Sequence, residues 1–199
     1  MIAFARIPRI IGGQNADIRD YPYSVSIRLE LDRYKHICGG AIISHHHILT
    51  AAQCVYGINA ESIVIYIGRT SAPDYSVRSY TITKIKIHPE FIGKIKPNSK
   101  THNDIAVLTT LQYIIFSGNQ NQINLPTADV EVGANAVITS WGMTSYPDGY
   151  TATTLQKASM VIVPNSECAN NLPFPVYNEN LCAVQGPGVG TCYVSLVYY

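Results

Sequence analysis

Three consecutive histidines, His45, His46 and His47, are the side chains of this sequence best suited to binding a metal ion. In an extended strand, neighbouring side chains point to opposite faces, so three in a row cannot all reach one ion. The alternative is a polar turn that half-buries one histidine. We expect that turn, and therefore no metal and no other cofactor.

Gln53 and Asp104 are two further polar side chains in apolar stretches, L-T-A-A-Q-C at 49–54 and N-D-I-A-V-L at 103–108. A carboxamide exchanges no proton near neutral pH, so Gln53 cannot serve as a general base. It can still hydrogen-bond to a buried carboxylate and preserve the local packing. Asp104, taken alone, is an aspartate of the kind that caps a turn or a strand.

Five cysteines are present, an odd number: Cys38, Cys54, Cys168, Cys182 and Cys192. No C-x-x-C occurs, so a zinc site or a thioredoxin-like redox site has little support. Widely spaced single cysteines fit disulfides formed in an oxidising compartment. One cysteine must then lack a partner within this chain.

The composition indicates a packed, β-rich globular protein. Hydrophobic residues make up 47% and charged residues 14% of 199 residues. A net charge of +1 gives no reason to expect nucleic acid or a membrane surface as partner. No apolar run approaches the roughly 18 residues of a membrane span. Eleven prolines, fourteen glycines and fourteen tyrosines suit many short strands.

The strands themselves are visible as alternating patterns. Apolar and polar residues alternate from 24 to 31, which predicts one buried face made of Val25, Ile27, Leu29 and Leu31. Further strands are predicted at 62–67, 77–87, 105–109 and 154–163. Between 84 and 100, five lysines accompany one acidic residue, Glu90, which indicates either a solvated loop or an anion-binding patch. We expect the solvated loop.

Six short motifs, in order along the chain, resemble those of trypsin/chymotrypsin-like serine peptidases. They are R-I-I-G-G at 9–13, C-G-G-A-I-I at 38–43, L-T-A-A-Q-C, N-D-I-A-V-L, I-T-S-W-G at 138–142 and N-L-C-A at 180–183. The resemblance implies an all-β, chymotrypsin-like double antiparallel barrel. It also implies a propeptide remnant or leader at 1–9, a first barrel with the N-terminal segment at 10–118, and a partial second barrel at 119–199.

The same resemblance assigns roles to individual residues. Gln53 occupies the place of the catalytic histidine, and Asp104 that of the carboxylate which orients it. Cleavage between Arg9 and Ile10 would be the activation step. Gly190 takes the pocket-floor position where trypsin-like members carry Asp, so an intact form would not favour Lys or Arg.

The resemblance also implies two disulfides, Cys38–Cys54 and Cys168–Cys182, whose separations of sixteen and fourteen residues match the family. Closing a loop of about 15 residues stabilises a fold by about 3 kcal/mol on the chain-entropy model. Cys192 is then the cysteine without a partner.

After Cys192 the sequence departs from the family's C-x-G-D-S-G-G-P. In register, Ser195 falls on the family's aspartate and Leu196 on its nucleophile, so Ser195 is not the catalytic serine. The oxyanion donors and the partner of an Ile10 ammonium are missing too. We expect a truncated homologue with an incomplete second barrel that is monomeric if folded and prone to aggregate. One hypothesis for its ending is translation into an intron that begins at Val194.

Three interpretations follow. The first is a catalytically inactive homologue, secreted by family analogy although no signal peptide is visible in residues 1–9, that binds an unidentified protein or peptide. The second is an active serine endopeptidase whose sequence is incomplete here, or whose histidine comes from the substrate. The third is a truncated product with no stable fold.

Overall fold

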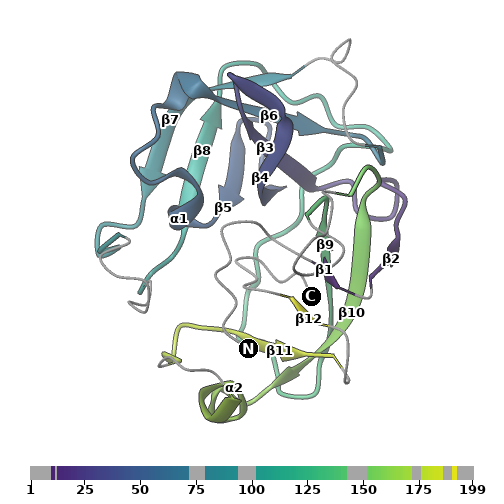
Figure 1. The fold of residues 1–199 in the computed structure, drawn as a ribbon, viewed down its shortest axis with the longest axis vertical. Helices are drawn as coiled ribbons and strands as arrows, with labels where there is room; N and C mark the ends of the chain where they lie inside the picture. The colour runs from purple at the N-terminus through teal and green to yellow at the C-terminus, as the bar shows by residue number, and fades with distance from the viewer. Residues whose placement is uncertain are drawn as a thin grey trace.

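The computed structural model describes residues 10–11, 13–71, 79–93, 102–142, 152–171, 176–185 and 190–191. It is an all-β fold in two halves, a closed barrel and a second sheet beside it (Figure 1). This is the chymotrypsin-like architecture that the motifs predict. Among the described residues, no helix is both long and apolar enough to cross a membrane.

The elements follow in chain order. The strands are β1 Ile10–Ile11, β2 Gln14–Asn15, β3 Ser24–Leu29, β4 Asp32–Ile42, β5 His47–Thr50, β6 Ile63–Ile67, β7 Tyr80–Ile87, β8 Ala106–Thr110, β9 Asn135–Ser140, β10 Gln156–Val163, β11 Cys182–Val184 and β12 Gly190–Thr191. The helices are α1 Ala52–Val55, α2 Asn165–Asn171 and the 3-10 turn η1 Ala60–Ser62.

The first half is a barrel closed in the order β3-β4-β5-β8-β7-β6, with every neighbouring pair antiparallel. Its strands are rich in isoleucine, whose branched side chain packs well on a pleated surface. Inward-facing residues such as Ile27, Ile65 and Leu108 are fully buried. Closure leaves this half with no free sheet edge.

Strand β3 differs from the prediction of one buried face. Val25 and Ile27 do point into the barrel core, but Ser24, Ser26 and Arg28 on the opposite face are buried too. The second half covers that face, and Ser24 Oγ lies 2.8 Å from Thr139 Oγ1. The assignment of Leu31 to the buried face is wrong, because β3 ends at Leu29 and Leu31 is 100% exposed in the turn that follows.

The second half is an open sheet in which β10 pairs with β9 along one edge and with β2 and β11 along the other. Its core is small and is formed by Ala136, Ile138, Ala158, Met160 and Ile162. The N-terminal strands belong here in space, since β2 pairs with β10 and β1 with β12.

A third cluster joins the two halves. Trp141 and Leu155 pack with Ala16 and Ile18 of the N-terminal segment. Thr70, just after β6 of the barrel, binds this cluster through three hydrogen bonds. Its carbonyl accepts the Trp141 indole N–H at 3.0 Å and the Leu155 amide at 2.7 Å, and its Oγ1 accepts the Ile18 amide at 2.9 Å.

In the histidine tract, His45 and His46 lie in a bend, as a polar turn requires, and His47 is the first residue of β5. Two side chains of the tract are half-buried, His45 and His46, where the sequence predicted one. The bend turns both toward the segment after β8, where the His45 ring stacks between Tyr113 and Phe116. Their Nδ1 atoms lie 2.8 and 3.2 Å from the carbonyls of Ile114 and Thr110. The described residues contain no group of three side chains that could hold a metal.

Candidate functional site

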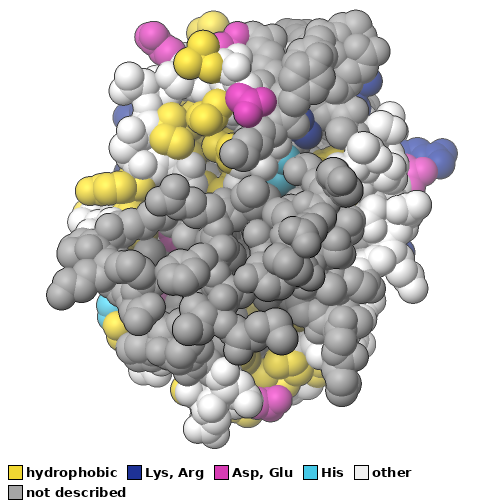
Figure 2. Space-filling view, in the orientation of Figure 1, with side chains coloured by type: hydrophobic (Ala, Val, Ile, Leu, Met, Phe, Trp, Pro, Cys, Tyr) yellow, Lys and Arg dark blue, Asp and Glu magenta, His cyan; other side chains and the backbone are white. Residues whose placement is uncertain are grey.

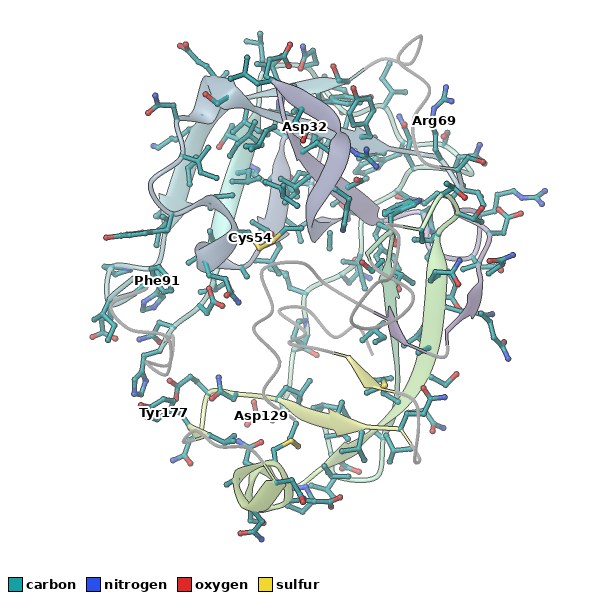
Figure 3. The ribbon with its side chains drawn as sticks, in the orientation of Figure 1. Asp32, Cys54, Arg69, Phe91, Asp129 and Tyr177 are labelled. Atoms are coloured by element: carbon teal, nitrogen blue, oxygen red, sulfur yellow. A yellow bond between two sulfur atoms is a disulfide. The ribbon has the colours of Figure 1, made fainter. Side chains whose placement is uncertain are left out.

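Gln53 lies on α1, a single helical turn that follows β5 directly. Ala52 and Val55 of this turn are fully buried under the barrel, while Gln53 on the other side is half-exposed. The disulfide Cys38–Cys54 ties the turn to β4. Figure 3 shows Cys54 at the end of the barrel that faces the second half. The fold therefore fixes position 53 at the junction of the two halves.

Asp104 precedes β8, the neighbour of β5 in the barrel, and reaches the same place from this adjacent strand. The Gln53 backbone N–H donates a hydrogen bond of 2.7 Å to Asp104 Oδ1. The turn before it is tight: Asn103 has a φ of 53°, and the Ile105 amide donates to the Asn103 carbonyl at 2.7 Å. Because the bond to Asp104 comes from the backbone, it does not depend on which side chain occupies position 53.

The expected disulfide of the second half is also present, and Cys168–Cys182 joins α2 to β11. The backbone pairing of β1 with β12 places Ile10 opposite Thr191 and Ile11 opposite Gly190. The positions to which the resemblance assigns activation and the pocket floor therefore lie on paired strands. Arg9, Cys192, Ser195 and Leu196 lie outside the described residues.

A sequence model of one known family, described as trypsin, matches residues 10–193. The chain belongs to the trypsin family. Among curated trypsin-family relatives, it is 33% identical to the venom peptide isomerase heavy chain of Agelenopsis aperta over 80% of this chain and 65% of that protein. It is 31% identical to trypsin iota of Drosophila melanogaster over 81% of this chain and 60% of that protein.

Trypsin-1 of Astacus astacus is 29% identical over 87% of this chain and 74% of its own length. The chain therefore spans 65% and 60% of the length of the first two relatives. Among solved structures, neuropsin, a serine protease expressed in the limbic system of mouse brain, superimposes with a TM-score of 0.80. It shares 20% identity and covers 92% of this chain and 78% of its own, so this likeness concerns the fold.

Within the trypsin-family fold, the chemistry at the junction is limited by Gln53. The Asp104 carboxylate accepts a hydrogen bond from the backbone N–H of Gln53. The carboxamide side chain at position 53 cannot take a proton from a nucleophile and return it to a leaving group. The other histidines near the junction have hydrogen-bond partners of their own. Sequence reasoning missed two of these, His36 and His102.

His36 of β4 is fully buried between the two halves. Its Nδ1 lies 2.8 Å from Ser26 Oγ of β3, and its Nε2 lies 3.5 Å from Ser140 Oγ of β9. Burial, together with the smaller effect of the positive charge of Arg28, lowers the pKa of His36 to about 3. The ring is therefore neutral at physiological pH and links one strand of each half.

His102, two residues before Asp104, also connects the halves. Its Nδ1 lies 2.6 Å from a Glu179 carboxylate oxygen, and its ring lies against that of Tyr177. Figure 3 shows Tyr177 in the second half, on the side where Phe91 marks the barrel. The local sequence holds no signal for this contact, because its partners are 77 residues apart.

Proposed function

We propose that this chain is a trypsin-family homologue that does not hydrolyse peptide bonds and binds a protein or peptide at the junction of its halves. One observation carries the proposal: Gln53 stands on α1 beside Asp104, at the place where the family has its general base. Removing that histidine alone costs on the order of 10⁶ in turnover in a well-studied serine peptidase.

The hydrogen bonding at Asp104 supports retention of the fold without catalysis. The carboxylate accepts its bond from the backbone of residue 53, so the exchange of histidine for glutamine leaves this contact in place. A surface that no longer performs chemistry is then still available for recognition. The sequence after Cys192, where Leu196 takes the nucleophile's place, agrees with the same proposal.

The two disulfides support an oxidising compartment, and we extend the proposal to a secreted protein. Gly190 in place of an acidic pocket floor favours apolar or aromatic side chains over Lys or Arg in any ligand.

A second candidate is an endopeptidase whose remaining catalytic groups belong to a longer chain or whose imidazole comes from the substrate. The presence of Asp104, ready to orient an imidazole, favours it, as do the relatives named trypsin.

A serine-directed fluorophosphonate tests whether this chain carries an activated serine. The purified chain and its Gln53→His variant are incubated with the labelled probe, and the bound label is counted by mass spectrometry against an active trypsin. We expect no label on either form, because restoring the histidine leaves Leu196 at the nucleophile's position. Stoichiometric labelling of the unmodified chain would contradict the proposal, and a cooperative thermal transition excludes a chain that does not fold.

A further inference from the structure

The outer face of β7 carries two lysines, Lys84 and Lys86, both exposed. They are two residues apart in a strand, so their side chains leave the same face at a spacing of about 7 Å. Figure 1 shows β7, β8 and β5 side by side in the barrel wall.

The register extends this face across three strands. His47 pairs with Thr109, which pairs with Lys84; Leu49 pairs with Val107, which pairs with Lys86. Paired residues of antiparallel strands share a face, so the two lysines border a patch of uncharged side chains. None of β5, β7 and β8 contains an aspartate or glutamate.

Neither lysine forms an ion pair within the part of the chain that the structure describes. Two acidic residues lie near this face, one in space and the other along the chain. Glu61 is on η1, which packs beside β7, and Glu90 follows the strand and accepts a hydrogen bond from the Asn103 amide at 3.3 Å. Two like charges on one face, without a counter-charge, favour a ligand that brings several negative charges at a regular spacing.

We propose that this lysine face, Lys84 and Lys86 with their neighbours on β8 and β5, binds a sulfated polysaccharide. Charge complementarity favours a polyanion. The two disulfides point to an oxidising compartment such as the cell exterior, where sulfated polysaccharides are abundant polyanions. With a net charge of +1, the chain as a whole has little attraction for polyanions, so binding would depend on this local face. The face uses no residue of the Gln53–Asp104 site.

Heparin is the probe. Wild type is run on heparin resin and on a sulfopropyl resin, and it is expected to need more NaCl for elution from heparin. Lys84→Ala/Lys86→Ala is expected to lose most of that difference, and Lys84→Arg/Lys86→Arg to keep it. Titration with heparin at several salt concentrations should show the slope of log affinity against log salt reduced by about 1 to 2 in the alanine variant.

The matched control is Arg69→Ala/Lys157→Ala, which removes the same number of charges from other places. Equal loss in this control, or equal elution of wild type from both resins, would show general ion exchange and overturn the proposal. The assignment to β7 would be overturned if changing Lys94, Lys96 and Lys100 to Ala abolished the preference for heparin while Lys84→Ala/Lys86→Ala left it unchanged. Thermal unfolding of each variant confirms that it is folded.

Discussion

The two halves of the molecule reach stability in different ways. The first half closes into a barrel and buries a large core within itself, whereas the second is an open sheet with a core of five small and medium side chains among the described residues. Hydrophobic side chains also reach the surface over the barrel (Figure 2). Tyr56 and Ile92 are among the exposed hydrophobic residues. Burial of apolar surface is the main source of folding free energy.

The difference shows which half the candidate site relies on. Gln53 and Asp104 both come from the barrel, and their contact is held by the disulfide of α1 and the turn before β8. The second half, in contrast, is joined to the barrel through Trp141 and Thr70. We therefore expect the contact between Gln53 and Asp104 to persist as long as the barrel is folded. We expect the second half to stay ordered only while its contacts with the barrel at Trp141 and Thr70 are intact.

Cavities in the two cores test this difference most directly. Ile65→Ala in the barrel should lower the free energy of unfolding by about 4 kcal/mol, and Ile162→Ala in the second half by about 2 kcal/mol, because a small core can collapse around the gap. Urea unfolding followed by circular dichroism gives both values. The fluorescence of Trp141, the single tryptophan of the sequence, reports on the junction.

Val132→Ala is the control for this pair, since its side chain is 63% exposed and the change should be nearly neutral. Equal losses at 65 and 162 would mean that the halves unfold as one body of uniform stability, and the comparison would fail.

His36, at the junction, gives the next largest effect. Its pKa of about 3 lies below the ordinary value of 6.5, so the unfolded chain takes up a proton that the folded chain refuses. Its contribution is therefore complete above pH 6.5 and is lost as the pH falls toward 3. At pH 5 the loss from this residue is about 2 kcal/mol.

The measurement is the difference in unfolding free energy between wild type and His36→Gln at pH 7 and pH 5. Glutamine keeps hydrogen-bonding groups but does not titrate, so the wild type should lose about 2 kcal/mol more than the variant over this range. Parallel pH profiles would show that the imidazole takes up its proton as readily in the folded state as in the unfolded chain.

The sequence predicted the barrel well and the junction poorly, for a physical reason. Val25 and Ile27 face a core built by neighbouring strands, and alternation alone places them there. On the opposite face, Ser24 contacts Thr139, 115 positions later, which no local pattern records. The link from His102 to Glu179 has the same origin.

At the site itself, the family motifs predicted that positions 53 and 104 lie close together. The structure adds that the backbone N–H of residue 53 makes the contact. No propensity or spacing distinguishes a backbone donor from a side-chain donor. The predicted disulfides Cys38–Cys54 and Cys168–Cys182 are both formed.

Asp104 should matter more for stability than Gln53, because its partner is a backbone group. Asp104→Ala leaves the Gln53 amide without this acceptor and should cost about 1–2 kcal/mol. Asp104→Asn retains an acceptor oxygen and should cost less, while Gln53→Ala should stay within about 0.5 kcal/mol. A larger loss for Gln53→Ala than for Asp104→Ala, measured by urea unfolding, would assign the contact to the side chain instead.

The smallest effect is expected at the polar link between His102 and Glu179. Both side chains are 38% exposed, so solvent screens their attraction, and Glu179→Gln should cost well under about 1 kcal/mol. If the apolar junction at Trp141 holds the halves together, this change leaves the Trp141 fluorescence unchanged and speeds amide exchange only around 102 and 177–179. A loss comparable to that of Ile162→Ala would mean that the link from His102 to Glu179, rather than the cluster around Trp141, holds the second half in place.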